Sequence, residues 1–374
     1  MGAEASTETM LAGVLHGKED LRMERIPVPH AADGELIVRV AAALTDGTDL
    51  KVYRRGYHAM MLKPPILFGH ELAGTVVEVG RGVTKFSVGD RVVPINSAPC
   101  DQCFFCLRGQ HNLCEDLLFN NGAYAEYIRI PARIVSKNTY FVPNTLPFEH
   151  AAMTEPLACV VHGFNETGAQ AGDTMAVIGA GPIGLMFMQV ARVRGVRVIA
   201  VAKRDDQVAA AWRFGASDVI QISSAPDALQ QSVSQVRALT GDSRGADVVI
   251  EAVATPATWE SGVAMVRNGG VVNFFGGPPK GTTVALDTNR LHYGDITLKA
   301  SFHHTPAACR TALALIATGK FDAAGFITGS ASLEDLPQIF AAMLTRSADN
   351  RGGIKTAILP AANAAAPAAK EPVA

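Results

Sequence analysis

Residues 174–195 read TMAVIGAGPIGLMFMQVARVRG, in which a short Val/Ile-rich run, a glycine turn and a longer apolar run follow one another. The turn has the pattern G-x-G-x-x-G and consists of Gly179, Ala180, Gly181, Pro182, Ile183 and Gly184. Between a strand and a helix, the first glycine permits a tight turn, the second lets the backbone approach a pyrophosphate, and the third lets the helix pack on the strand. The helix N-terminus adds free N–H groups and a favourable dipole. We therefore interpret the stretch as a dinucleotide-binding turn rather than a Gly-rich packing turn.

The same alternation of strand and helix continues downstream. Further Val/Ile-rich runs lie at 196–202, 218–222, 246–253 and 270–276, separated by helix-like stretches. Such alternation produces right-handed βαβ units and a doubly wound parallel sheet. We expect a Rossmann dinucleotide-binding domain of six strands over residues 161–297, in an α/β protein.

The segments on both sides of this domain have a different pattern. Between Leu36 and Pro147, short β-rich runs are punctuated by Gly, Pro and Asp, which predicts a β domain. After residue 297 the pattern becomes irregular, and we expect this segment to return to the first domain, which then comprises 11–160 and 298–360. Residues 1–10 and 361–374 are poor in large apolar side chains, and we expect both to be disordered.

Composition narrows the functional classes. The chain has 374 residues, with 33 Lys and Arg against 35 Asp and Glu, so its formal net charge is −2. This balance provides no general basic field for nucleic acid or an anionic membrane. The longest apolar stretch is interrupted by glycine and proline, and the first residues do not resemble a signal peptide. We expect a soluble, cytoplasmic protein that acts on a small molecule.

Four of the six cysteines form a cluster. Cys100, Cys103, Cys106 and Cys114 have the spacing C-x2-C-x2-C-x7-C within polar loop sequence. Four thiolates at this spacing can surround a tetrahedral Zn²⁺ with no open position, which indicates a structural site in a lobe near 97–116. An iron–sulfur cluster is the main alternative, because three cysteines with two-residue gaps resemble a ferredoxin run.

With these features the chain resembles the zinc-dependent medium-chain dehydrogenase/reductase superfamily, the alcohol and polyol dehydrogenases. Besides the cysteines and the glycine turn, the resemblance rests on Gly69-His70-Glu71, Gly89-Asp90-Arg91-Val92, Gly122-Ala123-Tyr124-Ala125-Glu126-Tyr127 and Glu155-Pro156-Leu157-Ala158. It implies a GroES-like β-rich catalytic domain built from both ends of the chain, a central Rossmann domain, and a homodimer or homotetramer. It also implies a second, catalytic zinc with three protein ligands and one exchangeable position.

The resemblance assigns the ligands of that zinc. His70 is the imidazole ligand, Glu155 takes the third position, and Glu71 stands beside the metal. The family usually has Cys at the first position, whereas this chain has Asp46, within Asp46-Gly47-Thr48-Asp49. A carboxylate is an accepted but harder zinc ligand, so the replacement affects affinity more than metal identity. Taken singly, each residue also fits an ordinary surface pair, turn or helix start.

Further positions follow from the same resemblance. Thr48 is expected to relay the alcohol proton, and Lys51 stands where many relatives have the outer histidine of the relay, although it is equally a solvated lysine. Lys355 matches a position that contacts the cofactor phosphates. Phe275 and Gly276 end a strand near the nicotinamide. His303 and His304 lie outside the ligand positions, and we interpret them as cleft lining or surface; Cys159 and Cys309 are expected to be small buried hydrophobes.

Cofactor choice depends on the end of the second Rossmann strand. The acid that holds the adenosine ribose in NAD-dependent enzymes is expected there, but this chain has Ala202, followed by Lys203 and Arg204. Two cations at this place favour the 2′-phosphate of NADP. If Asp205 or Asp206 turns back to the ribose instead, NAD use is restored.

The expected reaction is a reversible hydride transfer between an alcohol and the nicotinamide of NAD(P), with NADP favoured over NAD. The carboxylate-rich metal set favours polyols or sugars over long apolar alcohols. Two alternatives remain open: a lyase or epimerase that uses its nicotinamide transiently, and a cofactor-binding protein that has lost its catalytic zinc.

Overall fold

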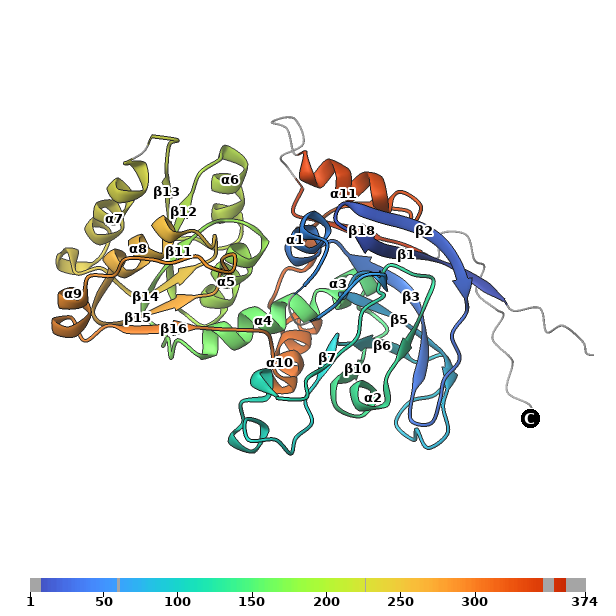
Figure 1. The fold of residues 1–374 in the computed structure, drawn as a ribbon. Coiled ribbons are helices and arrows are strands. Elements are labelled where there is room, and N and C mark those ends of the chain that lie inside the picture. Colours follow the sequence, from blue (N-terminus) through green and yellow to red (C-terminus); the bar gives the residue numbers. More distant parts are fainter. Residues whose placement is uncertain (1–7, 59–60, 226, 346–352, 361–374) are drawn as a thin grey trace, which may run out of the picture.

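The computed structural model describes residues 8–58, 61–225, 227–345 and 353–360. A six-stranded parallel sheet and the β-rich remainder of the chain form two parts, joined by helices α4 (Thr154–Asn165) and α10 (Pro306–Ala317), as Figure 1 shows. The proposed disorder of 1–7 and 361–374 concerns residues outside the described ranges.

The parallel sheet has the strand order β13-β12-β11-β14-β15-β16, the order of a complete dinucleotide fold. Its strands are β11 (Thr174–Ile178), β12 (Arg197–Ala202), β13 (Asp218–Gln221), β14 (Ala246–Glu251), β15 (Val266–Phe274) and β16 (Thr297–Ala300). Its helices are α5 (Pro182–Val193), α6 (Asp205–Arg213), α7 (Ala228–Ala238), α8 (Pro256–Met265) and α9 (Thr288–Tyr293), with a short 3-10 turn η3 (Gly241–Ser243). The fold class predicted from the sequence is confirmed.

Burial on both faces explains why the central strands are uniformly apolar. Successive residues of a strand point to opposite faces. In β11, Val177 packs into a cluster with α4 and α5, whereas its neighbours Ala176 and Ile178 pack into a second cluster with α7 and α8. The sheet therefore lies between two helical layers (Figure 1).

The first and last parts of the chain share a seven-stranded sheet. Its order is β10-β6-β5-β3-β18-β17, with β9 paired to β3. These strands are β3 (Leu36–Leu44), β5 (Leu72–Val79), β6 (Arg91–Pro94), β9 (Tyr127–Ile130), β10 (Thr139–Phe141), β17 (Ile327–Ala331) and β18 (Lys355–Ile358). Ala357 of β18 is paired with Leu44 of β3. The C-terminal strand β18 thus lies in the same sheet as β3.

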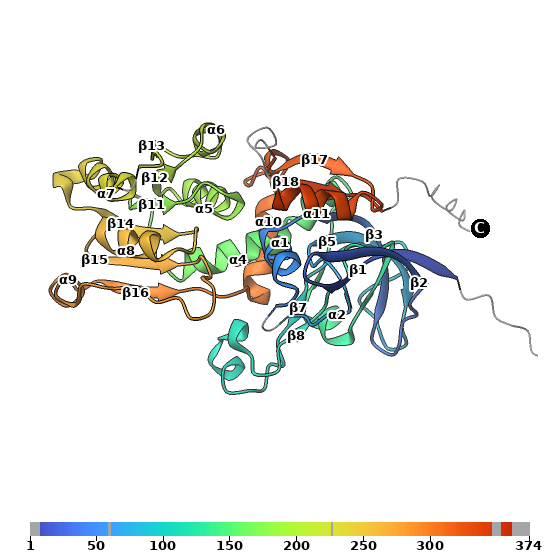
Figure 2. The same ribbon diagram turned by 45° about the horizontal axis from the view of Figure 1, so that its top comes forward.

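Smaller elements complete this part. A three-stranded sheet contains β1 (Thr9–Gly17), β2 (Asp20–Pro27) and β4 (Ile66–Leu67), and a hairpin of β7 (Ser97–Ala98) and β8 (Leu118–Phe119) carries the cysteine lobe with η1 (Cys106–Arg108) and η2 (His111–Leu113). The remaining helices are α1 (Gly47–Arg55), α2 (Ala132–Asn138), α3 (Phe148–Ala152), η4 (Ala324–Phe326) and α11 (Leu336–Leu344). The lobe projects from the body in Figure 2.

Two boundaries differ from the predictions. Thr9 and Met10 are not disordered but begin β1, because Met10 packs against Ala12 and is 1% exposed. Residues 298–300 do not return to the first domain but belong to β16, the sixth strand of the Rossmann sheet. An edge strand that is short and half exposed has a weak apolar pattern, which explains why the position of the sixth strand was not predicted.

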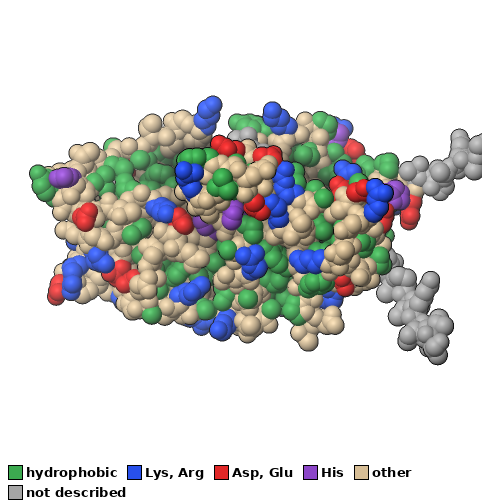
Figure 3. All heavy atoms as spheres, turned by 90° about the horizontal axis from the view of Figure 1, so that it is seen from below, with side chains coloured by type: hydrophobic (Ala, Val, Ile, Leu, Met, Phe, Trp, Pro, Cys, Tyr) green, Lys and Arg blue, Asp and Glu red, His purple; other side chains and the backbone are tan. Residues whose placement is uncertain are grey.

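Two surface properties agree with the composition. In Figure 3, Lys and Arg side chains are interspersed with Asp and Glu over the face shown. Within the described ranges, no helix combines the length and the apolar character needed to span a bilayer.

Candidate active site

The three predicted catalytic ligands come from three segments. Asp46 is the N-cap of α1, His70 lies two residues before β5, and Glu155 lies in the first turn of α4. One carboxylate oxygen of Asp46, Oδ2, accepts a hydrogen bond from the Thr48 N–H at 3.0 Å, which leaves Oδ1 for another partner. Ligand atoms of Asp46, His70 and Glu71 all lie within 4.8 Å of one another.

The orientation of His70 depends on a residue that the sequence analysis did not single out. Asp49, one turn along α1, places Oδ1 2.8 Å from His70 Nδ1, and its Oδ2 accepts from the Tyr124 hydroxyl at 2.7 Å. A carboxylate on one ring nitrogen directs the other, Nε2, at a metal. The signal was present in the sequence, since Asp49 closes the Asp-Gly-Thr-Asp stretch and both acids fall at the start of α1.

Lys355 has a different partner from the one predicted. Its Nζ lies 2.7 Å from both carboxylate oxygens of Glu71 and donates to the Thr45 carbonyl at 3.1 Å. Its side chain is 2% exposed. A buried ammonium takes the strongest available anion, so here Lys355 neutralises Glu71 instead of facing cofactor phosphates.

Glu155 also has neighbours that were not expected. Ligand atoms of Glu155, Cys159 and His303 lie within 4.8 Å of one another, and His304 Nε2 is 3.6 Å from Glu155 Oε1. Cys159 is therefore not simply a packed hydrophobe. His304 is 2% exposed and points inward, which excludes the surface interpretation.

Burial and neighbouring charges act in opposite directions on the two acidic ligands. Burial raises the pKa of Glu155 to about 7, against the opposing effect of the His70 charge. For Asp46 burial also favours the neutral form, but the charges of Lys355 and His70 and the Thr48 N–H outweigh it and lower its pKa. A cation bound beside Asp46 and Glu155 would stabilise the charged form of both carboxylates.

Thr48 and Lys51 lie on α1. Thr48 is half-buried beside Asp46, whereas Lys51 is exposed, three residues further along. The exposure of Lys51 fits the solvated alternative at least as well as the relay.

The four cysteines of the lobe converge as predicted from their spacing. Their sulfur atoms lie within 4.8 Å of one another, with Cys100 Sγ and Cys106 Sγ 3.9 Å apart. Backbone N–H groups point at sulfur, and those of Cys106 and Glu115 lower the pKa of Cys103 to about 6. Burial raises the pKa of Cys106 to about 12 and also raises that of Cys114, so the metal site is indicated by the convergence of the four sulfur atoms.

The glycine turn has the geometry that a pyrophosphate needs. Gly179 has φ +100°, and a Cβ on Gly184 would lie 1.8 Å from the Gly179 carbonyl oxygen, so neither position accepts a side chain. A Cβ on Gly181, the N-cap of α5, would meet nothing within 4 Å. The space over Gly181 is therefore open to a ligand, while Pro182 and Ile183 start the helix.

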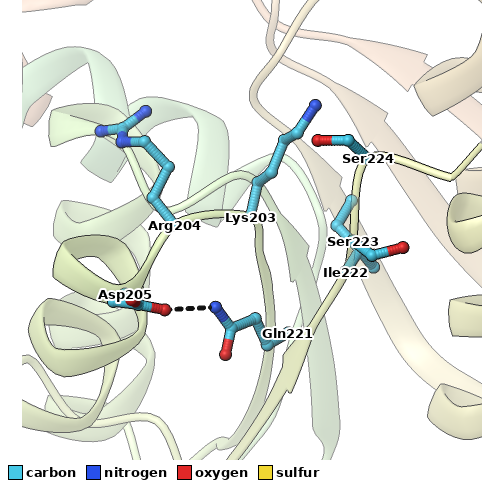
Figure 4. A pocket seen from close by; sticks show the side chains of 7 residues that line it. All are labelled: Lys203, Arg204, Asp205, Gln221, Ile222, Ser223 and Ser224. Carbon is cyan, nitrogen blue, oxygen red and sulfur yellow. Dashed lines mark hydrogen bonds between the residues drawn. The ribbon is translucent and has the colours of Figure 1, made fainter. Parts of the chain in front are cut away.

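Two pockets that share Arg204 lie at the glycine turn and at the end of β12. One is lined by Gly181, Pro182, Arg204, Thr328 and Ile354, among others. The second, shown in Figure 4, is lined by Lys203, Arg204, Asp205, Gln221, Ile222, Ser223 and Ser224. Both lie where the adenosine half of a dinucleotide binds in this type of sheet.

The acids after β12 are already engaged. Ala202 is the last residue of β12, as expected from the sequence. Asp206 pairs with Arg204 at 3.0 Å, and Asp205 Oδ1 accepts from Gln221 Nε2 at 2.7 Å (Figure 4). Neither carboxylate is directed at the ribose position in this arrangement.

Phe275 and Gly276 follow the end of β15. Their N–H groups both donate to the Glu251 carbonyl, at 3.0 and 2.9 Å. A Cβ on Gly276 would lie 2.7 Å from the Ala254 nitrogen, so the chain is closely packed at this edge of the sheet.

Comparison with known proteins agrees with this geometry. Residues 32–143 match the alcohol dehydrogenase GroES-like domain, and residues 182–318 match the zinc-binding dehydrogenase family. Sorbitol dehydrogenase from Bacillus subtilis (strain 168) is 30% identical over 334 residues, covering 87% of this chain and 91% of that one. L-threonine 3-dehydrogenase from Bacillus velezensis is 33% identical over 325 residues, covering 85% and 90%.

A solved structure is similar to nearly the whole chain. A predicted zinc-binding dehydrogenase from Sinorhizobium meliloti 1021, bound to NADP, has a TM-score of 0.84 and 29% identity, covering 94% of this chain and all of that one. Two family models in the expected order, with a relative 30% identical over most of both chains, show that the protein belongs to the zinc-dependent medium-chain dehydrogenase/reductase superfamily.

Proposed function

We propose that the protein is a zinc-dependent, NADP-preferring dehydrogenase that transfers hydride between a polyol or sugar hydroxyl and the nicotinamide. The observation that carries this proposal is the metal set, in which one imidazole and two carboxylates replace the usual thiolate-rich arrangement. Oxygen donors make the site harder and more polar. A substrate with several hydroxyls suits such a pocket better than a long apolar alcohol.

The donor chemistry fits zinc. Asp46 Oδ1, His70 Nε2 and Glu155 would hold the ion, and the two carboxylates would balance its charge. Bound there, zinc would act as a Lewis acid that lowers the pKa of the substrate alcohol. The Glu71–Lys355 ion pair leaves the adjoining wall neutral, because both oxygens of Glu71 are within 2.7 Å of Nζ.

Residues of this chain would accept the alcohol proton and bind the cofactor. Thr48, beside Asp46 on α1, would accept the alcohol proton through its hydroxyl while its own hydroxyl proton passes on towards solvent. When bound, the nicotinamide would supply the acceptor for the hydride. The pyrophosphate would lie over Gly181 at the N-terminus of α5.

Preference for NADP is supported by the second pocket. Lys203, Arg204 and the hydroxyls of Ser223 and Ser224 all line it, whereas Asp205 is held by Gln221. A 2′-phosphate would receive charge-assisted hydrogen bonds there. NADP in the Sinorhizobium meliloti structure shows that a related chain binds this cofactor.

The decisive experiment is net reduction of NADP and NAD with a panel of polyols, aldoses, simple alcohols and L-threonine, combined with metal analysis. We expect two zinc ions per chain and the highest kcat/KM with a polyol or sugar. Asp46→Ala should abolish most activity, whereas Asp46→Cys should retain it. Absence of net cofactor reduction with every substrate would contradict the dehydrogenase and favour the lyase or epimerase alternative.

Lability distinguishes the two metal sites. Thiolates hold zinc more tightly than carboxylates do. Mild chelation should therefore remove activity while the fold survives. Unfolding that precedes the loss of activity would contradict this assignment.

A further inference from the structure

We propose that Glu155, Cys159 and His303 form a second position for the active-site metal, so that one divalent ion can move between this position and the one at Asp46 and His70. The inference rests on the proposed zinc-dependent function and concerns the ligands of the same site. The ion must be one that accepts sulfur, nitrogen and oxygen together, such as Zn²⁺ or Co²⁺.

The three donors come together from two segments distant in sequence. Glu155 and Cys159 are four residues apart in α4, so they share one face of the helix. His303 arrives from the segment between β16 and α10. Their ligand atoms lie within 4.8 Å of one another, and Cys159 Sγ is 3.9 Å from Glu155 Oε1.

This spacing is close to that of an occupied site. Zinc–oxygen and zinc–sulfur bonds of about 2.0 and 2.3 Å at tetrahedral angles place oxygen and sulfur roughly 3.5 Å apart. For this pair, the observed 3.9 Å requires a movement of only a few tenths of an ångström. Such a movement is within the ordinary range of side-chain adjustment.

His303 is held in position by its surroundings. Its φ of +62° is in the left-handed region, which residues other than glycine adopt uncommonly and chiefly where the surrounding structure imposes it. Its ring centroid lies 5.3 Å from that of Phe119 and 3.8 Å from that of His304. Nε2 lies 2.6 Å from Ser97 Oγ. The ring contacts and this hydrogen bond together fix the orientation of the imidazole beside Glu155 and Cys159.

Glu155 connects the two positions. It belongs to the second set by distance, and its charge also acts on His70 in the first. Because both positions would share Glu155, and two divalent ions on one carboxylate repel each other, a single ion is expected. Binding at Cys159 requires loss of the thiol proton, which passes to solvent as the sulfur–metal bond forms.

Cobalt spectroscopy tests the proposal without an activity readout. The cysteine lobe of the full-length protein is first filled with one equivalent of Zn²⁺, and Co²⁺ is then titrated. We expect one further equivalent of Co²⁺ with a thiolate-to-cobalt charge-transfer band in the near ultraviolet. Cys159→Ser should remove this band. His303→Gln should raise the dissociation constant of Co²⁺ about tenfold, which is the usual effect when a metal site loses one supporting group.

Cys309→Ser is the matched control. It also removes a buried thiol outside the lobe, and it should keep the band. One bound Co²⁺ without a sulfur band, or with a band that Cys159→Ser leaves unchanged, would overturn the second position and leave the proposed function intact. No Co²⁺ uptake beyond the lobe would overturn both. Circular dichroism shows whether each variant is folded. If Cys159→Ser does not fold, His303→Gln tests the same metal position independently.

Discussion

Replacement of Lys203 by alanine should convert an NADP-preferring protein into one with little preference. Lys203 is exposed, follows the last residue of β12, and lines the same pocket as Ser223 and Ser224. Within the described residues, only its backbone N–H has a recorded hydrogen-bond partner, Gln207 at 3.3 Å. Its ammonium is therefore available to a 2′-phosphate without first breaking another ion pair.

The expected loss of kcat/KM for NADP depends on how Lys203 differs from Arg204, which is already paired with Asp206. A charge-assisted hydrogen bond contributes about 1.5–3 kcal/mol. Arg204 must first exchange Asp206, to which it is bound at 3.0 and 3.2 Å, so its net contribution is smaller. Solvent screening at an exposed site keeps Lys203 near the lower end of that range. We therefore expect about a tenfold loss in kcat/KM for NADP, since 1.4 kcal/mol corresponds to tenfold.

The assay is steady-state kinetics with both cofactors, together with their dissociation constants at two salt concentrations. NAD kinetics should change less than about twofold, because NAD has no 2′-phosphate. Lys320→Ala removes the same charge from an exposed position that lines neither pocket, and it should change neither cofactor. Equal losses for NADP and NAD in Lys203→Ala, or a wild-type preference for NAD, would refute the reasoning.

Three further outcomes are expected. Asp49→Asn should weaken zinc retention about 10- to 100-fold, because the carboxylate that orients His70 is lost; zinc remaining after dialysis measures this. Gly184→Ala should lower the free energy of unfolding in urea by about 1–3 kcal/mol, since its Cβ would lie 1.8 Å from a backbone oxygen. Gly181→Ala, whose Cβ would meet nothing within 4 Å, should leave stability unchanged and weaken only cofactor binding. Asp247→Asn should cost about 1 kcal/mol at pH 7. Burial opposes ionisation of Asp247, but a backbone N–H and an arginine outweigh it and lower its pKa, so the difference from wild type should hold down to about pH 4 and shrink as the pH falls below the ordinary value of 3.8.

The elements that could be predicted from the sequence are determined by short-range sequence patterns. The alternation of apolar strands with helices, and the glycine turn between β11 and α5, depend on neighbouring residues, so the sheet could be predicted without tertiary information. β16 could not, because an edge strand buries little and has little apolar pattern.

Side-chain partners in the site depend on contacts distant in sequence. Lys355 meets Glu71 across 284 positions, and a buried carboxylate decides where its ammonium goes. His303 turns inward because its backbone is left-handed and its ring contacts Phe119. Neither outcome has a signal in the residues adjacent to it, which is why the pairing of Lys355 with Glu71 was not predicted and the position of His303 was left open.

Helix α4 links the metal ligands to the sheet that carries the cofactor turn. Glu155 lies in its first turn, and near its other end the Gly163 carbonyl accepts a hydrogen bond from Asn273 of β15 at 2.8 Å. A Cβ on Gly163 would lie 2.9 Å from the ring of Phe275, so the helix and the end of β15 are in close contact. Because a helix is stiff over a dozen residues, a shift of either end is transmitted to the other. An ion that moved from Asp46 toward Cys159 would remain bound to Glu155. It would therefore stay attached to helix α4, which is packed against Phe275. A shift of Glu155 on metal binding would therefore be transmitted along α4 to Phe275 and the end of β15.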